Sequence, residues 1–431
     1  MSEYIIETDN ITYFYDGSKV PSLKDVSIGI RKNTKTILLG ANGAGKSTLF
    51  YHFNGVVKPE SGKVLFDGSP IGYRGKALKQ LRSRIAVVLQ NPDDQIFGQT
   101  VEADVAYGPT NIGLPQSEVD ARVDEALGLV GLGELRDRNT TQLSYGQRKR
   151  LSLAGALAMK PEVLIMDEPT AGLDPQMALE LMELAEELHD AGTTVVISTH
   201  DVDLAYAWAD EIHVLRRGSL VFSGTSEDFY SDPVNVYTTG LMQPSMYQLN
   251  DAMSKMKGVS PMPYPRTETQ LISKMAPGRK TGRLILIPVK ERMDRYMVDA
   301  ALEKVDSGLT IGLYGSVPRS LLSESQLPVD YVFDGFEACV SDCMAGRDSL
   351  LMCSETSMET VKGKIRRLEE FGTPLDWTVI EDPMRTALPE TLPHNNIFRG
   401  RPASRRSTMT PGPHPLLLEI RYVAIAKNAT M

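Results

Sequence analysis

The feature that most constrains this chain is a glycine-rich loop between a short apolar segment and a helical one. The apolar segment TILL precedes GANGAGKST, residues 40–48, and a helix is expected to begin near Lys46. A strand, a glycine-rich loop and a helix in this order let backbone N–H groups converge on phosphate oxygens. A chance glycine turn beside a surface lysine would lack this flanking pattern. The feature therefore predicts a phosphate-binding loop in an α/β fold.

Each residue type in this loop suits a bound phosphate. Gly40, Gly43 and Gly45 allow close backbone approach, and the helix N-terminus adds partial positive charge. Lys46 can reach the β- and γ-phosphates of a nucleotide, and Ser47 offers a hydroxyl ligand to Mg²⁺. We therefore expect the loop to bind ATP with Mg²⁺ through Gly40, Ala41, Asn42, Gly43, Ala44, Gly45, Lys46, Ser47 and Thr48.

An acidic pair follows a second apolar segment. EVLIMDE places Asp167 and Glu168 at the carboxyl end of a buried strand, where open α/β sheets bind ligands. Taken alone, such an acidic pair is more often part of a solvated strand end. Only the phosphate loop upstream makes a functional role the favoured interpretation. With both motifs present, Asp167 is predicted to hold the metal through water. Glu168 is predicted to polarise the attacking water as general base.

Length and composition limit what the chain can be. Its 431 residues are too many for one compact core, and 42% hydrophobic with 23% charged residues is typical of soluble globular proteins. The net charge of -9, without a Lys or Arg block in the first 350 residues, argues against nucleic acid as a partner. The acidic N-terminus does not resemble a signal peptide, and no apolar run approaches the roughly 20 residues of a membrane span, so a membrane role is expected to be peripheral.

Strand-like runs alternate with helical patterns in two regions. Residues 1–235, the N-terminal domain, are predicted to form an α/β fold with buried parallel strands. Residues 236–282 are proline-rich and polar, with a weak helical stretch over Tyr247–Met256, and are interpreted as a linker. Residues 283–385, the second domain, are predicted to form a smaller α/β unit. Residues 386–431 are predicted to be a disordered tail with one short strand, PLLLEIRYVAIA.

The second domain carries no motif that names a family. About five strands are expected in it, LILIPV, TIGLYG, YVFD, SLLMCS and WTVIE, with helices over residues 291–304, 337–344 and 358–371. The carboxyl edge of such a sheet can bind a small ligand or metal. An inert structural or dimerising domain is the simpler interpretation. The residues that would face a ligand there are Gly315, Ser316, Asp334 and Glu337.

The cysteines and the basic tail each leave two interpretations open. Cys339, Cys343 and Cys353 are an odd number confined to one region, which fits a reducing cytoplasm. Buried free thiols are favoured over a metal-sensing site because standard zinc spacings are absent. The tail is either solvated or in contact with anionic lipid. Its relevant residues are Arg399, Arg401, Arg405 and Arg406.

Six motifs in a fixed order resemble those of the ATP-binding cassette (ABC) ATPases, over roughly residues 3–230. Besides the phosphate loop and the acidic pair, LSYGQRKR resembles the family signature, usually LSGGQ, with Tyr145 replacing the first glycine. Gln90 in VVLQNPDD resembles the Q-loop glutamine, and Asp174 in AGLD resembles the D-loop residue. His200 in VVISTHD resembles the switch histidine.

This resemblance implies an ABC-type P-loop NTPase fold and a role for each motif. Two cassettes would sandwich two ATP molecules head to tail, with Asp174 crossing to the other subunit, which is either an identical chain or a paralogue. His200 would hydrogen-bond the γ-phosphate, and Gln90 would contact metal and water. Tyr15 would stack on adenine, with Tyr13 as the alternative. The γ-phosphate of the opposite subunit's ATP would be bound by Ser144, Gly146 and Gln147.

The stretch NPDDQIFGQTVEADVAYGPTNIGLP most resembles energy-coupling-factor ATPases, especially those of cobalt and nickel importers. The resemblance implies a motor subunit for micronutrient uptake, with Co²⁺ or Ni²⁺ first and a vitamin second, peripheral on the cytoplasmic face of the cell membrane. In the family this stretch receives a helix of a transmembrane subunit. Ile96, Phe97, Val101 and Val105 are its apolar residues; they could equally belong to the ordinary core, and for each residue taken singly the core is the favoured interpretation.

Soluble ABC proteins are the alternative class. Members that act on DNA would have a long coiled coil between the nucleotide motifs, and members that act on the ribosome would have a second cassette. The sequence has neither feature.

Overall fold

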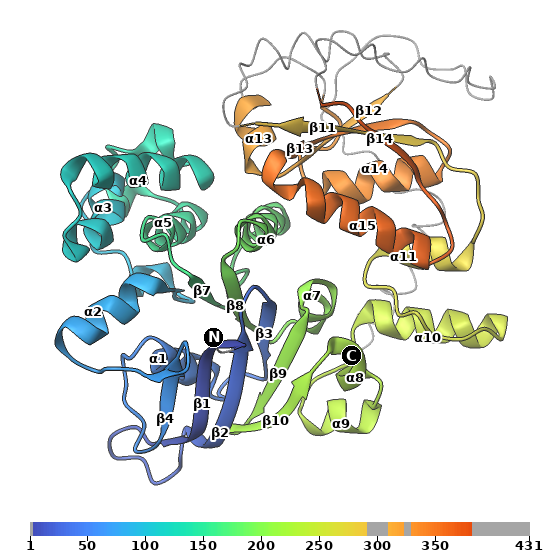
Figure 1. The fold of residues 1–431 in the computed structure, drawn as a ribbon. Helices are drawn as coiled ribbons and strands as arrows, with labels where there is room; N and C mark the ends of the chain where they lie inside the picture. The colour runs from blue at the N-terminus through green and yellow to red at the C-terminus, as the bar shows by residue number, and fades with distance from the viewer. Residues whose placement is uncertain (1–2, 291–308, 323–328, 382–431) are drawn as a thin grey trace. The chain divides into compact units, whose positions relative to one another are not determined.

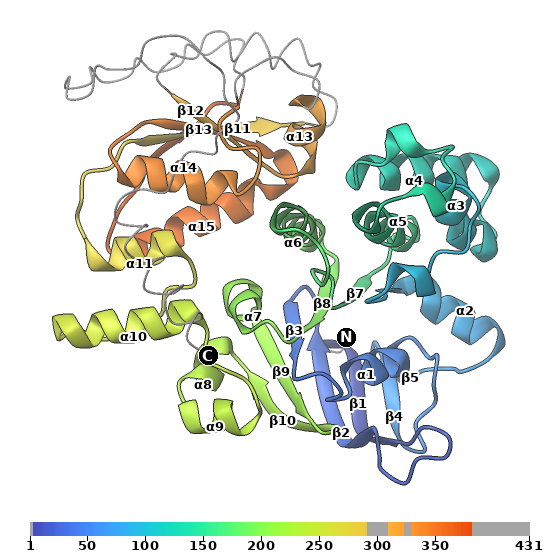
Figure 2. The same cartoon turned by 180° about the vertical axis from the view of Figure 1, so that it is seen from behind.

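The computed structural model describes residues 3–290, 309–322 and 329–381. Residues 1–388 belong to one compact unit, whose ribbon is shown from two sides in Figures 1 and 2. Among the described residues, no helix is both long and apolar enough to span a bilayer. The helix expected over 291–304 and the strand expected in the tail lie outside the described residues, as do Arg399, Arg401, Arg405 and Arg406.

A six-stranded sheet forms the centre of the N-terminal domain. Its spatial order is β10 (Ser219–Gly224), β9 (Glu211–Arg216), β3 (Lys35–Leu39), β8 (Thr194–Thr199), β7 (Val163–Asp167) and β6 (Ile85–Val88). All neighbours are parallel except the antiparallel pair β10 and β9. Every residue of β7 and β8 is buried, as expected for parallel strands covered on both faces. The carboxyl ends of β3, β8, β7 and β6 therefore lie side by side at one edge of the sheet.

A second, antiparallel sheet supports the phosphate loop from the other side. Its order is β2 (Leu23–Arg31), β1 (Tyr4–Tyr13), β4 (Ser61–Phe66) and β5 (Ser69–Pro70). Helix α1 (Lys46–Phe53) shares one apolar core with both sheets. In that core Leu49, Phe50 and Phe53 meet side chains such as Ile6 from β1 and Ile165 from β7. This packing fixes the helix that follows the phosphate loop.

A group of helices covers another part of the central sheet. α3 (Val101–Ile112), α4 (Gln116–Leu129) and α5 (Tyr145–Leu157) lie beside one another, as Figure 1 shows, and α2 (Gly75–Arg84) precedes β6. Val101 and Val105 are fully buried in the core of this group, and Ile96 packs against it. Phe97 differs, because 61% of its surface is exposed.

Residues 236–282 contain more helix than their proline content suggests. α9 (Pro233–Thr238), α10 (Ser245–Lys257) and α11 (Glu268–Met275) lie here, after the short helix α8 (Ser226–Tyr230). Pro233 occupies a first-turn position of α9 and Pro244 precedes α10. Three prolines lie between α10 and α11, and Pro277 follows α11. Proline is compatible with the start of a helix because the first N–H groups of a helix have no partner within it.

The second domain is built on a four-stranded parallel sheet. Its order is β12 (Thr310–Tyr314), β13 (Ser349–Ser354), β11 (Arg283–Val289) and β14 (Asp376–Val379). One apolar core joins the sheet to α14 (Gly335–Met344), α15 (Met358–Glu370) and α11, and a separate core involves α13 (Ser316–Leu322). The expected strand YVFD is reduced to one bridge, Tyr331 to Gly312. Asp334, with φ of 53°, turns the chain into α14 before a longer ladder can form.

The second domain contacts the N-terminal domain through helix α6 (Pro175–Asp190). Glu186 accepts hydrogen bonds from Tyr314 Oη at 2.6 Å and from Lys364 Nζ at 2.7 Å. Glu187 accepts from the backbone N–H of Ser316 at 2.8 Å and from Ser354 Oγ at 2.7 Å. Glu183 pairs with Arg319, and Asp190 accepts from Thr360. Four acidic side chains on one helix therefore attach the two domains.

Candidate active site

The sheet order brings four of the predicted motifs to one edge. The loop 40–48 follows β3, His200 follows β8, Asp167 ends β7 and Gln90 lies two residues after β6. These four strands are consecutive neighbours in the sheet. Ligands in open α/β sheets bind outside the carboxyl ends of the strands, so this edge of the sheet is the candidate ligand site.

The phosphate loop has the backbone conformation that its glycines predict. Gly43 and Gly45 have φ of 77° and 108°, backbone angles that residues other than glycine rarely adopt. A Cβ on Gly45, the residue before α1, would lie 2.9 Å from the carbonyl oxygen of Ser22. Lys46 is buried, and its Nζ lies 2.6 Å from the Gly40 carbonyl oxygen. The loop is therefore held in shape by its own lysine, and the glycine at position 45 allows the close approach of Ser22, the residue before β2.

Glu168 lies at the centre of this arrangement. It is 4% exposed, with φ of 44°. Its carboxylate accepts from Lys46, whose Nζ is 3.1 Å from Oε1, and lies 3.0 Å from Nδ1 of His200. A left-handed conformation at a residue other than glycine costs on the order of 1–3 kcal/mol and is concentrated at functional sites. The backbone strain and the two side-chain partners, Lys46 and His200, both mark Glu168 as a functional residue.

Ser198 is a site residue that the sequence reasoning missed. It lies beside Asp167 in the pairing of β7 with β8. Its hydroxyl donates to the Asp167 carboxylate and accepts from the backbone N–H of Glu168 at 3.2 Å. The sequence signal was a serine two residues before His200. Its meaning depends on which strands are neighbours, and the sequence alone does not give that.

The side chains near the loop fit a Mg²⁺ ion. Ser47, Asp167 and Gln90 supply hydroxyl, carboxylate and amide oxygens, the hard donors that Mg²⁺ prefers. Asp167 uses Oδ1 for Ser198, which leaves its second carboxylate oxygen for water or metal. The donor chemistry is therefore consistent with the predicted metal.

Tyr15 lies beside the phosphate loop. Its hydroxyl is 3.1 Å from Oγ1 of Thr48, and 43% of the side chain is exposed. Tyr13 is half-buried and packs edge to face on His52 at 4.9 Å. Tyr13 is therefore packed against neighbouring side chains, whereas Tyr15 is the more exposed of the two tyrosines.

The signature residues and Asp174 contact one another and lie apart from the phosphate-loop contacts described above. Ser144 caps α5, with its hydroxyl 3.3 Å from the Gln147 N–H, and the Gln147 side chain bonds back to the Ser144 N–H at 2.9 Å. Asp174 caps α6 by accepting from the Met177 N–H at 2.9 Å. A Cβ on Gly146 would overlap Met177 Sδ, so these two helix starts are in close contact.

Tyr145, the departure from the usual signature, has a defined position. Its ring lies over Gly172, where a Cβ would be 3.0 Å from Cε1 of the tyrosine. The guanidinium carbon of Arg148 also lies over this ring, 5.9 Å from its centroid. The tyrosine therefore fills space beside the loop that leads to Asp174.

The candidate ligand edge of the second domain is used by the chain itself. Ser316 donates to Glu187, and the backbone N–H of Asp334 donates to Glu183 at 3.2 Å. Glu337 accepts from Thr269 Oγ1 at 2.6 Å. A Cβ on Gly315 would overlap the Glu187 carboxylate, so this glycine allows the approach of α6.

The three cysteines are buried, and burial raises the pKa of each thiol, to about 12 for Cys343 and Cys353. The described part of the chain contains no group of three or more His, Cys, Asp or Glu side chains placed to hold a metal ion. These observations favour the buried-thiol interpretation.

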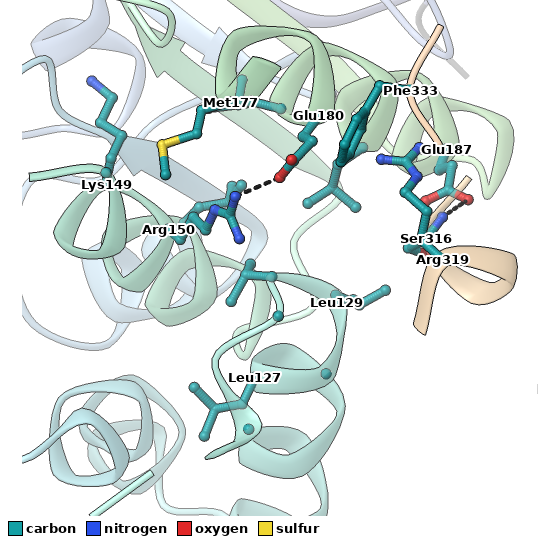
Figure 3. A pocket seen from close by; sticks show the side chains of 18 of the residues that line it. Leu127, Leu129, Lys149, Arg150, Met177, Glu180, Glu187, Ser316, Arg319 and Phe333 are labelled. Carbon is teal, nitrogen blue, oxygen red and sulfur yellow. Dashed lines mark hydrogen bonds and ion pairs between the residues drawn. The ribbon is translucent and has the colours of Figure 1, made fainter. Parts of the chain in front are cut away.

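A cavity of about 770 Å³ lies away from the phosphate loop, between α4, α5, α6 and the second domain (Figure 3). Apolar side chains such as Leu129 and Phe333 line it, together with the ion pair of Arg150 and Glu180. None of the loop residues 40–48 lines this cavity. It is therefore separate from the phosphate loop, although Gly146 and Lys149 of the signature helix lie in its wall.

Comparison with known proteins agrees with this geometry. Residues 23–171 match the family described as ABC transporter. The energy-coupling factor transporter ATP-binding protein EcfA of Methanocaldococcus jannaschii is 46% identical over 253 residues, which are 58% of this chain and 90% of that protein. This chain belongs to the ABC transporter ATPase family. The predicted family and the predicted ATPase activity are thus confirmed, and among its relatives this ABC ATPase belongs with the ATP-binding subunits of energy-coupling factor transporters.

Two further relatives extend the comparison. EcfA2 of Methanospirillum hungatei is 33% identical over 401 residues, covering 91% of this ABC ATPase and 98% of that protein, so its similarity continues beyond the N-terminal domain. The solved structure of cbiO1 from Clostridium perfringens, described as part of the ABC transporter complex cbiONQ, is 37% identical with a TM-score of 0.51. It covers 60% of this chain and 100% of its own.

Proposed function

We propose that this ABC ATPase hydrolyses Mg-ATP at the edge formed by β3, β8, β7 and β6 and so drives micronutrient uptake. Glu168 is the main support for the proposal. Its backbone is strained, and its buried carboxylate lies between Lys46 and His200 at the carboxyl ends of the strands. Glu168 would accept a proton from the attacking water as general base. Lys46 would bind the β- and γ-phosphates, and His200 would hydrogen-bond the γ-phosphate and orient the water.

The remaining residues of the loop bind and orient the nucleotide. The backbone N–H groups of residues 40–48 surround the phosphates, and the N-terminus of α1 adds partial positive charge. Tyr15 stacks on adenine. Ser47, Gln90 and Asp167 would hold Mg²⁺, which when bound neutralises charge shared between the phosphates.

The working unit in this proposal is a dimer of cassettes. Ser144, Gly146 and Gln147 form the capped N-terminus of α5, and Gly146 lies against Met177 in the first turn of α6. An N-terminus of this kind stabilises an anion, here the γ-phosphate held by the other cassette. Asp174 lies at the start of α6 and is exposed, as a residue that crosses to a second subunit must be. The second cassette is an identical chain or a paralogue.

A transmembrane subunit is the other proposed partner. Phe97 and Tyr107 are 61% and 52% exposed, and their rings meet edge to face at 4.2 Å. This exposed aromatic pair follows Gln90 closely in the chain and suits a helix of a membrane subunit. We place the ATPase peripherally on the cytoplasmic face of the cell membrane for this reason.

The transported solute is proposed to be Co²⁺ or Ni²⁺, with a vitamin as the second candidate. The similarity to cbiO1, part of the complex cbiONQ, and the NPDDQIF stretch support this choice. The test is to purify the native complex and to measure ATP-driven uptake of radiolabelled Co²⁺, Ni²⁺ and vitamins. Uptake of none of them, or hydrolysis coupled only to efflux, contradicts the proposal.

Glu168→Gln tests the catalytic assignment. The variant keeps the shape of the side chain but cannot accept the proton, so turnover should fall by roughly 100-fold or more while ATP binding remains. Wild-type hydrolysis in this variant would exclude Glu168 as the base.

A further inference from the structure

A buried lysine joins three of the site's elements. Lys149 is the fifth residue of α5, two positions after Gln147, and it is 0% exposed. Its Nζ lies 2.6 Å from the backbone oxygen of Gln90 and 3.4 Å from those of Leu89 and Glu168. Figure 3 shows the ammonium nitrogen pointing away from the other side chains that line the cavity. An ammonium has three donors, and here each one has a carbonyl acceptor.

The position has a cost that an apolar side chain would avoid. Taking an ammonium out of water costs several kcal/mol unless its hydrogen bonds are made. Burial lowers the pKa of Lys149 to about 8, although the charges of Asp167 and Glu168 act in the opposite direction. A leucine or methionine at this position would pack in the same core without that cost, but it would remove a donor from three carbonyl groups. The Glu168 oxygen would keep the Ala171 N–H, at 3.2 Å, as its donor.

Two other contacts join α5 to the segment after Gln90. Arg148 Nε lies 2.8 Å from Oδ1 of Asp93. Gln95 accepts from the Leu89 N–H at 2.9 Å and donates to the Ser152 oxygen at 3.2 Å. Neither contact reaches Glu168. Lys149 is the side chain that connects the helix of the signature, the Gln90 loop and the turn of the general base.

We propose that Lys149 is a positioning residue for ATP hydrolysis, which fixes the backbone at Gln90 and Glu168 to the signature helix. This inference rests on the proposed roles of Gln90 and Glu168 and adds the residue that aligns them. When α5 moves, Lys149 moves the backbone of both residues with it. Its contacts are with backbone oxygens alone, so it acts on the reacting groups through their position.

The test compares Lys149→Met with Lys160→Met in the full chain. Lys160 lies just beyond the same helix and pairs with Glu125 on the surface, so it is a matched control for the change of residue type. Displacement of reacting groups by about 1 Å costs up to roughly 100-fold. We expect kcat of Lys149→Met to fall by about 10- to 100-fold, with ATP affinity, measured with a fluorescent ATP analogue, within about threefold of wild type.

A change in magnesium dependence separates positioning from general destabilisation. If Gln90 is displaced, the Mg²⁺ concentration for half-maximal hydrolysis should rise in Lys149→Met, whereas a smaller folded fraction would leave it unchanged. Lys149→Arg keeps the charge and the donors and should recover part of kcat. Lys149→Arg also serves as the test if Lys149→Met does not fold. In that case, wild-type kcat and wild-type magnesium dependence in Lys149→Arg would show that Lys149 has a purely structural role, and the inference would be wrong.

Two outcomes overturn the inference while Glu168→Gln remains inactive. The first is kcat of Lys149→Met within twofold of wild type. The second is a parallel loss of kcat and nucleotide-binding stoichiometry with unchanged magnesium dependence. Full hydrolysis by Glu168→Gln would instead refute the proposed function itself, so the two failures are distinguishable.

Discussion

The contact between α6 and the second domain predicts a large stability effect for Lys364→Met. Lys364 Nζ lies 2.7 Å from Oε2 of Glu186 and 3.0 Å from the Tyr314 hydroxyl, and the Glu186 side chain is 10% exposed. Burial disfavours the charged form of Glu186, but Lys364 and Lys35 outweigh it and lower its pKa from 4.5 to about 2. That difference corresponds to roughly 3 kcal/mol of stability at neutral pH.

The substitution removes the nearer of the two cations. Lys35 remains at 3.4 Å from Oε1, so part of the stabilisation survives. We expect Lys364→Met to lower the free energy of unfolding by about 2 kcal/mol, because it leaves a buried carboxylate only partly paired. Lys362→Met is the matched control, since Lys362 lies on the same helix and pairs with the exposed Glu359. Its effect should be within about 0.5 kcal/mol.

Urea unfolding of the full chain measures these differences. The chain has two tryptophans, Trp208 and Trp377, so a Trp208→Phe background leaves one reporter in the second domain. The pKa of Glu186 is depressed in the folded state, so its contribution is fully present above about pH 4.5 and is lost as the pH falls toward 2. The difference between Lys364→Met and wild type should therefore shrink below pH 4.5. Equal stabilities of Lys364→Met and Lys362→Met at pH 7 would refute the reasoning.

Two further substitutions test individual contacts. Ser198→Ala removes the hydroxyl that joins Asp167 to the Glu168 N–H. We expect the rate of ATP hydrolysis in a steady-state assay to fall by about 10-fold, while thermal denaturation shows that the fold is retained. An unchanged rate would contradict the role of Ser198. Gly172→Ala places a side chain at φ of 76° and 3.0 Å from the Tyr145 ring, so the melting temperature should drop by an amount equivalent to about 1–2 kcal/mol. Gly192→Ala is the control, because Gly192 also has a positive φ but no atom lies near its added Cβ. A larger drop in melting temperature for Gly172→Ala than for Gly192→Ala measures the contact with the Tyr145 ring.

The sequence predicted the N-terminal domain well because its strands are continuous apolar runs. The strands β3, β7 and β8 all lie where TILL, EVLIMD and VVIST predicted them, since buried parallel strands have no polar face to break the pattern. In residues 236–282 the helix expected over Tyr247–Met256 is confirmed as α10, whereas α11 was not expected among the prolines. Prediction also failed at YVFD, because apolar residues indicate a strand but not the length of its ladder.

The site shows which part of a mechanism can be predicted from residue types. Spacing identified the ends of the strands and hence Lys46, Glu168 and His200. The role of Ser198 depends on the β7–β8 register, and that of Lys149 on the distance between α5 and the end of β6. Both are long-range contacts whose partners are separated by 31 and 59 residues. Local sequence patterns contain no information at that range.

The contacts of Glu168 bear on the order of events at the site. In this structure its carboxylate is shared by Lys46 and His200, so both of its oxygens are already engaged by side chains of the site. A γ-phosphate carries more negative charge than one carboxylate and would compete for the same lysine. Nucleotide binding should therefore release Glu168 from Lys46 and make it available to water. A structure with bound ATP in which Lys46 still contacts Glu168 would contradict this sequence of events.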